Sequence, residues 1–293
     1  MKPAPFKYYA PATVEEALAL LAKYGYDAKA LAGGQSLIPT MNFRLAQPSV
    51  LVDLNRIVQL FYIKPGESGG VLIGAMTRES QVEHDPLIAA RVPLVREAMP
   101  HIAHPQIRNR GTFGGCIAHA DPAAELPAVC VALNARFRVR NPAAERWVPA
   151  GEFFVGFFTT ALQPDELLVE IALPPLPPRS GWSFQEIARR HGDYALVGVA
   201  AVVTLDGGHR CQQARVVFLS VGDGPVEARQ AAEVLIGQTL TAEALRAAAE
   251  TAASADVDPS SDIHASADYR RHLVKVLTRR SLKQAFERAS SAR

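Results

Sequence analysis

Two glycine-rich turns contain the residue types in this sequence best suited to binding a phosphate group. The first follows an apolar segment and consists of Gly33 and Gly34 with the polar residues Gln35 and Ser36. Adjacent glycines can point several backbone N–H groups into one concavity, and the missing Cβ atoms let an anion approach closely. The Ser36 hydroxyl adds a donor, so the turn suits a pyrophosphate. Taken alone the signal is weak, because a Gly-Gly turn after a strand is more often a plain turn.

The second turn repeats this order of residues and leads toward a predicted helix. Gly114 and Gly115 follow Thr112, and the acidic residues Asp121 and Glu125 come shortly after them. We predict that Asp121 is the N-cap of the helix, with the next residue, a proline, at its first position. Two carboxylates four residues apart would then face the same way and could accept hydrogen bonds from ribityl or ribose hydroxyls. The alternative is that Asp121 only caps its helix.

Several other side chains have a structural interpretation at least as strong as a functional one. His101, His104 and His119 are close in sequence, but neighbouring prolines disfavour the regular helix that a metal site would need. Arg108 and Arg110 could pair with a pyrophosphate, although solvated or interface arginines are favoured.

Aromatic and loop residues leave similar alternatives open. Residues 153–154 and 157–158 are two Phe-Phe pairs, which we expect in the core, with a subunit interface as the alternative. Cys130 is expected to be a buried small apolar residue. Arg189 and Arg190 suit either a partner contact or a solvated loop, and Tyr194 judged by itself suits core packing.

The elements expected around the two turns fall on either side of a proline-rich segment at 174–178, which fits neither helix nor strand and predicts a stiff linker. Before it, hydrophobic spacing and capping residues predict helices at 13–25, 77–82 and 88–99 and strands at 28–32, 50–54, 137–140 and 167–173, with a hairpin of 61–63 and 71–73. After it, they predict strands at 196–205 and 214–221 and helices at 227–235, 242–253 and 267–288.

Composition narrows the class of protein. The chain has 293 residues, 48% hydrophobic and 20% charged, which predicts two domains with ample cores. A net charge of +2, spread along the chain, does not resemble a nucleic-acid binder. The sequence contains no run of twenty apolar residues, so no membrane span is predicted, and the N-terminus lacks an apolar signal core. We therefore expect a cytoplasmic protein. The three cysteines form no close pair, so redox chemistry would require an organic cofactor or a partner.

Taken together, the two turns resemble those of the FAD-binding medium subunits, or middle domains, of the molybdenum hydroxylases. The resemblance extends to the segments 6–13, 51–54 and 184–195 and covers nearly the whole chain. It implies an α+β fold with a PCMH-type FAD-binding domain at 1–176, made of subdomains at about 1–56 and 57–176. A smaller α+β domain of the carbon monoxide dehydrogenase flavoprotein type is implied at 180–290.

The resemblance also implies a non-covalent FAD site, with no metal ligand and no catalytic acid, base or nucleophile in this chain. Both turns embrace the pyrophosphate, Glu125 contacts the sugar-like chain with Asp121 close by, and Tyr194 lies next to the isoalloxazine ring. The residues implied to contact FAD are Leu31, Ala32, Gly33, Gly34, Gln35, Ser36, Leu37, Ile102, Thr112, Phe113, Gly114, Gly115, Cys116, Asp121, Glu125, Leu168, Gln185 and Tyr194.

Two positions depart from the family pattern. Gln35 stands where relatives carry histidine, asparagine or threonine, and Cys116 stands where asparagine or aspartate is frequent. Both turns keep their glycines, so FAD binding is expected, while the contacts of these two side chains are not specified. Gln35 cannot form the histidyl bond by which some related folds hold flavin covalently.

The implied function is electron transfer within a larger complex. Substrate is oxidised at a molybdenum cofactor on a large partner subunit, and electrons pass through two [2Fe-2S] clusters on a small subunit to FAD and then to an external acceptor. A dimer of heterotrimers is expected. The alternatives are an independent FAD-dependent oxidoreductase, which would need a base that the sequence does not offer, and an assembly module that has lost its cofactor.

Overall fold

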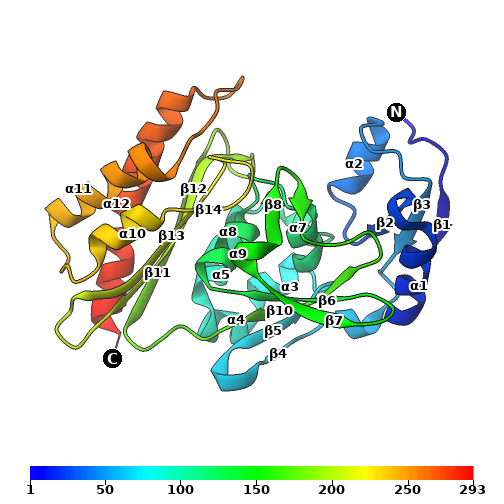
Figure 1. Cartoon of the computed structure of the whole chain (residues 1–293), viewed down its shortest axis with the longest axis horizontal. Helices are drawn as coiled ribbons and strands as arrows, with labels where there is room; N and C mark the ends of the chain where they lie inside the picture. The colour runs from blue at the N-terminus through cyan, green and yellow to red at the C-terminus, as the bar shows by residue number, and fades with distance from the viewer. Residues whose placement is uncertain (293) are drawn as a thin grey trace.

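The computed structural model describes residues 1–292, which form three sheet-centred bodies in a row (Figure 1). The N-terminal sheet lies at one end of the molecule, and the C-terminal sheet and its long helix lie at the other. The strands are β1 Lys7–Tyr9, β2 Ala28–Leu31, β3 Val50–Asp53, β4 Ile63–Pro65, β5 Val71–Gly74, β6 Arg136–Arg140, β7 Glu145–Pro149, β8 Phe154–Gly156, β9 Thr159–Thr160, β10 Leu167–Leu173, β11 Ser180–Ala188, β12 Ala195–Leu205, β13 Cys211–Leu219 and β14 Val226–Glu227. The helices are α1 Val14–Tyr24, α2 Leu37–Asn42, α3 Glu79–His84, α4 Pro86–Arg91, α5 Pro93–Ala98, α6 Pro105–Arg108, α7 Phe113–His119, α8 Glu125–Ala132, α9 Ala150–Phe153, α10 Arg229–Leu235, α11 Ala242–Thr251 and α12 Ala267–Ser291.

The first body is a small β-α-β unit that contains the helix and the two strands predicted in the first fifty-odd residues. Its strands run parallel in the order β1-β3-β2, and Leu31 at the end of β2 is in register with Asp53 at the end of β3. Helix α1 begins as predicted, because the Thr13 side chain accepts a hydrogen bond from the Glu16 N–H. The parallel arrangement brings the residues that follow β2 and β3 to the same edge of the sheet.

The second body is a five-stranded antiparallel sheet in the order β4-β5-β10-β6-β7, covered by short helices. The hairpin of β4 and β5 and strands β6 and β10 are confirmed. The single helix predicted at 88–99 is wrong, because the chain breaks at Val92 into α4 and α5. Val92 precedes Pro93, and the proline ring disfavours helical backbone angles in the residue before it.

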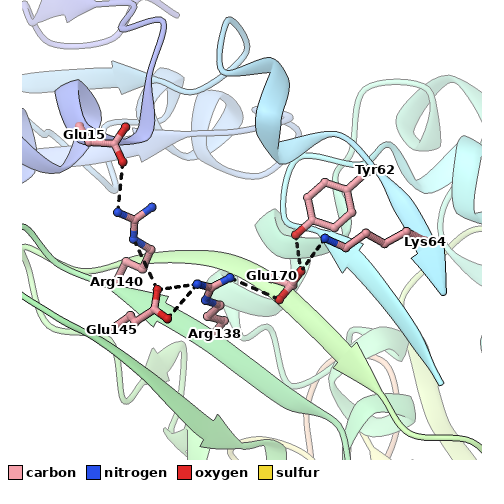
Figure 2. A network of polar contacts seen from close by, with 7 residues as sticks. All are labelled: Glu15, Tyr62, Lys64, Arg138, Arg140, Glu145 and Glu170. Carbon is pink, nitrogen blue, oxygen red and sulfur yellow. Dashed lines mark hydrogen bonds and ion pairs between the residues drawn. The ribbon is translucent and has the colours of Figure 1, made fainter. Parts of the chain in front are cut away.

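The first two bodies share a core, and an ion pair joins them at its edge. Buried Leu167 and Val169 of β10 pack into the same cluster as Val14 and Val50 of the first body. Above this core, Glu15 of α1 pairs with Arg140 of β6 at 3.1 Å (Figure 2). An exposed pair of this kind contributes about 1 kcal/mol at most, so the shared core holds the two bodies together more than the pair does. The network continues through Glu145 and Arg138 to Glu170, which also contacts Tyr62 and Lys64.

The C-terminal sheet, in the order β11-β12-β13-β14, is covered on both faces. Phe184 of β11 and Val217 of β13 pack into the core that contains α5 and α8. The opposite face packs against α10 and α12. Burial on both sides explains why every residue of β12 is buried and why its sequence is an uninterrupted run of small and apolar residues.

Two local expectations are wrong. Asp121 does not cap a helix: its carboxylate accepts a hydrogen bond from the Ala123 N–H at 2.9 Å, and α8 begins only at Glu125. The left-handed backbone at Ala120 ends α7 and turns the chain before Asp121. The second error concerns Phe157, which is 63% exposed at the tip of the β8–β9 hairpin with Phe158 beside it. Phe153 and Cys130 are in the core as expected.

Candidate cofactor-binding site

The two glycine turns, about eighty residues apart in the sequence, are in direct contact. A Cβ atom on Gly33 would lie 2.4 Å from the Arg110 carbonyl oxygen and 2.8 Å from the Gly111 Cα. A Cβ on Gly115 would lie 3.2 Å from the Cβ of Ala32. Gly33 is therefore required for the backbones of the two turns to approach each other, whether or not a ligand is bound, and Gly115 makes a tight contact at the same place.

The first turn offers a set of free donors. The backbone N–H groups of Gly33, Gly34, Gln35 and Ser36 donate to no acceptor within residues 1–292, and neither does the Ser36 hydroxyl. Gly34 has a φ of +73°, and the Gln35 side chain donates to the Gly33 carbonyl oxygen at 3.0 Å, which closes the turn on itself. Such a cradle of N–H groups without Cβ atoms fits an anionic group such as a pyrophosphate. Leu31 and Leu37 flank the turn, at the end of β2 and the start of α2.

The second turn is anchored differently from the first. The N–H groups of Phe113 and Gly114 donate to Thr77 and Ala75 at 3.0 and 2.9 Å, and the Gly115 N–H donates to the Thr112 hydroxyl. A Cβ on Gly114 would lie 2.5 Å from that of Ala75, so Gly114 lets the turn pack on the end of β5. These N–H groups are already used, so the second turn contributes its shape and position more than a row of free donors.

An arginine and an asparagine that the sequence did not single out hold the two turns together. The Arg78 guanidinium donates to the Arg110 carbonyl oxygen at 2.5 Å and to the Asn55 Oδ1 at 2.6 Å. The Asn55 amide in turn donates to the Ala32 carbonyl oxygen at 2.9 Å. This Asn55–Arg78 bridge therefore runs from one turn to the other. No local motif marks it, because Asn55, Arg78 and the two carbonyl groups that they bind come from four separated segments.

Buried acids lie beside the second turn. Glu79 is only 4% exposed, and its carboxylate lies where a Cβ on Gly111 would be. Burial raises its pKa from 4.5 to about 8. Burial, followed by the charge of Glu186, also raises the pKa of Glu125 to about 8. Both are therefore largely protonated at neutral pH. The Cys116 thiol lies near Glu79, Glu125 and Asp121, and burial together with these charges raises its pKa well above 9.0.

The C-terminal domain adds Tyr194 to this neighbourhood. Its ring is 73% exposed, which excludes the core-packing interpretation. Partial burial and the charges of Asp121 and Glu125 raise the pKa of its hydroxyl. The loop that carries Tyr194 rests on the second body through Gly192, whose φ is +84° and whose Cβ would lie 2.4 Å from the His104 ring. Three separate parts of the chain thus meet at one place.

Gln185 and Glu186 point to opposite sides of β11. Gln185 Nε2 donates to Gln284 of α12 at 3.4 Å, on the face that packs away from the two turns. Glu186 contacts His101 on the other face at 3.5 Å. The contact predicted between Gln185 and the cofactor stays a prediction. Glu186 is an acidic residue on the opposite face of β11 from Gln185, and sequence reasoning missed it.

The contacts predicted between the remaining residues and the cofactor stay predictions. Ile102 and Leu168 are buried in the large core, as is Phe113. Arg108 is not solvated: it forms a buried bidentate ion pair with Glu83 at 2.7 Å and donates to the Ile102 carbonyl oxygen, so its guanidinium is already engaged within the chain. The His119 ring packs against that of Phe158 at the aromatic hairpin tip, tilted by 48° with ring centroids 5.0 Å apart. Across residues 1–292, no three His, Cys, Asp or Glu side chains are grouped as a metal ion would need.

These features define a domain with a phosphate-binding cradle, joined to a second domain that reaches back to the site. Residues 4–176 match the family model of the FAD-binding domain in molybdopterin dehydrogenase, and residues 182–285 match that of the carbon monoxide dehydrogenase flavoprotein C-terminal domain. The chain belongs to the FAD-binding medium subunits of the molybdenum hydroxylase family, which are oxidoreductase subunits.

Similarity to characterised relatives extends over the whole chain. It is 44% identical over 289 residues to the 6-hydroxypseudooxynicotine dehydrogenase complex subunit alpha of Paenarthrobacter nicotinovorans, covering 99% of this chain and 97% of that one. It is 41% identical over 290 residues to the carbon monoxide dehydrogenase medium chain of Hydrogenophaga pseudoflava, covering 99% and 100%. Its fold matches the solved carbon monoxide dehydrogenase from that organism with a TM-score of 0.94 at 41% identity, covering 98% and 99% of the two chains. Quinoline 2-oxidoreductase from Pseudomonas putida 86 matches with a TM-score of 0.93 at 40% identity, covering 99% of each.

Proposed function

We propose that this chain holds one FAD without a covalent bond and passes electrons from redox centres on partner subunits to an external acceptor. The observation that carries the proposal is the contact between the two glycine turns, with four consecutive free N–H groups at Gly33–Ser36. A bound flavin supplies reversible electron transfer. The protein residues supply position and electrostatics.

In this proposal, the first turn binds the pyrophosphate through its N–H groups and the Ser36 hydroxyl. The second turn fixes the position of the first turn through the Asn55–Arg78 bridge. Glu125, held neutral by burial, offers both a donor and an acceptor to ribityl hydroxyls. Tyr194 borders the flavin ring from the C-terminal domain. Cys116 contributes a small, protonated side chain rather than a nucleophile, because its pKa is raised.

The partners we propose are a large subunit with the molybdenum cofactor and a small subunit with two [2Fe-2S] clusters, assembled as a dimer of heterotrimers. Relatives that are themselves subunits or chains of dehydrogenases support this division of labour. Three free cysteines suit a cytoplasmic, reducing compartment. The chain provides no helix, between residues 1 and 292, with the length and apolar character to span a lipid bilayer. We propose domain limits of 1–176 and 180–290, with the first divided near residue 56.

The experiment is an absorbance spectrum of the purified chain before and after addition of FAD, followed by heat release and identification of the cofactor. Oxidised-flavin bands with intact FAD released would support the proposal. A colourless protein that takes up no FAD, both alone and when co-expressed with its partner subunits, would contradict it. Turnover of an organic substrate by the isolated chain would instead favour an independent oxidoreductase.

A further inference from the structure

A buried arginine of α12, Arg270, binds the backbone at the ends of two strands of the C-terminal sheet. Its side chain is 7% exposed, and its guanidinium donates to the carbonyl oxygen of Leu196 in β12 and, at 3.1 Å, to that of Ser220 directly after β13. The carboxylate of Asp262, in the segment before α12, pairs with it at 2.6 Å. A buried charge is tolerated when it is paired and hydrogen-bonded, and a planar guanidinium holds several acceptors at fixed positions.

Both carbonyl groups lie where the regular pairing of the sheet stops. Leu196 is the extra residue of a β-bulge, so it is not in register with a residue of β11, and the pairing of β12 with β13 begins only at Gly198. Ser220 has a φ of +63°, which ends β13. Bulges redirect the side chains beside them and are frequent next to active sites. Arg270 therefore fixes backbone geometry that the sheet itself leaves free.

The two segments that Arg270 joins lead directly to the candidate site. Leu196 comes two residues after Tyr194, so the arginine holds the end of the loop that carries the tyrosine. The Ser220 N–H donates to the Pro122 carbonyl oxygen at 2.8 Å. Pro122 lies between α7 and α8, and α7 is the helix that begins in the second turn. Arg270 thus connects the Tyr194 loop with the segment that follows the second turn.

The Tyr194 ring depends on its backbone for its position. The ring is 73% exposed, so packing of the side chain itself holds it only weakly. On one side of the tyrosine, Gly192 rests against the His104 ring, and on the other side Arg270 binds the Leu196 carbonyl group. Loss of the arginine would release the second anchor and leave the first in place.

We propose that Arg270 is a positioning residue: it holds Tyr194 at a fixed distance from the α7–α8 segment, and thereby beside the flavin. The proposal rests on the proposed function, which places Tyr194 next to the isoalloxazine ring. Side chains that border a reacting group must be held to within about 0.5 Å by the residues behind them. Arg270 supplies that support through the backbone.

The test measures flavin fluorescence of FAD-loaded protein, freed of unbound FAD and compared at equal flavin absorbance. A tyrosine ring in contact with an excited flavin quenches its emission by lending it an electron that returns at once, and this quenching falls steeply with distance. Tyr194→Ala removes the quencher and defines the full rise in emission. Arg270→Met keeps the tyrosine but releases its loop, so it should give at least half of that rise. In the double variant, Arg270→Met should add nothing to Tyr194→Ala, because the two changes act on the same ring.

A matched control separates positioning from the general loss of a buried arginine. Arg215 of β13 is also mostly buried and pairs with Glu227 at 2.6 Å. Arg215→Met should therefore leave the emission at the parent level.

A second variant serves if Arg270→Met does not fold. Asp262→Asn keeps the Oδ1 atom that accepts two backbone N–H groups of its own loop, but it replaces the Oδ2 atom that pairs with Arg270 by an N–H donor. The emission should rise as in Arg270→Met. Asp258→Asn is its control, because Asp258 belongs to the same loop and pairs with Arg271 instead.

Parent-level emission in Arg270→Met or Asp262→Asn, or an equal rise in the matching control, would overturn the proposal. A further rise when Arg270→Met is added to Tyr194→Ala would also overturn it, because the arginine would then act on the flavin by another route. Unchanged emission in Tyr194→Ala would remove the tyrosine from the flavin and this proposal with it. Failure of the parent protein to bind FAD would instead refute the proposed function.

Discussion

The substitution Gly33→Ala tests whether contact between the two turns sets the affinity for FAD. The added methyl group would lie 2.4 Å from the Arg110 carbonyl oxygen and 2.8 Å from the Gly111 Cα. Carbon atoms in ordinary contact are about 3.5–4.0 Å apart, so the turns must separate by about 1 Å. Strain of this kind costs about 1–3 kcal/mol. If the cost falls on cofactor binding, the Kd for FAD rises roughly 5- to 150-fold.

The assay is a titration of the apoprotein with FAD by calorimetry, accompanied by a thermal melt without cofactor. Gly151→Ala is the matched control, because a Cβ at Gly151 meets no atom within 4 Å. The melt shows whether the strain is already present in the free protein, and the titration shows how much of it appears only on binding. If Gly33→Ala binds FAD as tightly as Gly151→Ala does, the two turns do not jointly form the pyrophosphate site and the argument is refuted.

Three further predictions concern groups around the site. Arg78→Met removes the bridge between the turns. Because hydrogen bonds to charged groups contribute about 1.5–3 kcal/mol, FAD should bind at least tenfold more weakly in the same titration. Unchanged affinity would assign Arg78 to packing alone. Glu79 has a pKa raised from 4.5 to about 8, so the native state holds its proton more tightly than the unfolded chain, and its contribution to stability is lost as pH rises from about 4.5 through 8. Glu79→Gln should make the free energy of unfolding fall less steeply between pH 5 and pH 8, by up to about 1.4 kcal/mol per pH unit, as measured by urea unfolding at both pH values. Equal slopes in both proteins would contradict this prediction. Gly192→Ala should displace the loop that carries Tyr194 and alter the visible spectrum of bound FAD, because Gly192 has a φ of +84° and an added Cβ would lie 2.4 Å from the His104 ring and 2.8 Å from the Ala103 carbonyl oxygen. An unchanged spectrum would show that this loop does not border the flavin.

Much of the fold could be predicted because local signals agreed with the tertiary structure. The Thr13 cap, the Gly33–Gly34 turn and the proline-rich linker each depend on the preferences of a few adjacent residues. The errors arose where a local signal competed with another. Asp121 and the proline after it have the composition of a helix start, but the left-handed residue before them diverts the chain and delays the helix to Glu125.

The candidate site was predictable only in part, for a physical reason. The turn residues share recognisable spacing, whereas the Asn55–Arg78 bridge and the Glu186–His101 contact join segments that no local pattern connects. For Glu186, strand alternation offered a usable signal: neighbouring residues of β11 face opposite sides, so Gln185 and Glu186 could not both face the cofactor. Which of the two residues faces the cofactor depends on where α12 packs, and only the tertiary structure shows this.

The candidate site is formed by residues from three bodies, each with its own sheet, and this has a thermodynamic consequence. A ligand that contacts all three binds only when they are docked, so its binding free energy is added to the free energy of docking. Free FAD at one hundred times its Kd would add about 2.7 kcal/mol to the stability of the assembled chain. When cellular FAD is scarce, the bodies should open more often, and the chain should become more susceptible to proteases. The supply of cofactor would then regulate the amount of this subunit as well as its activity.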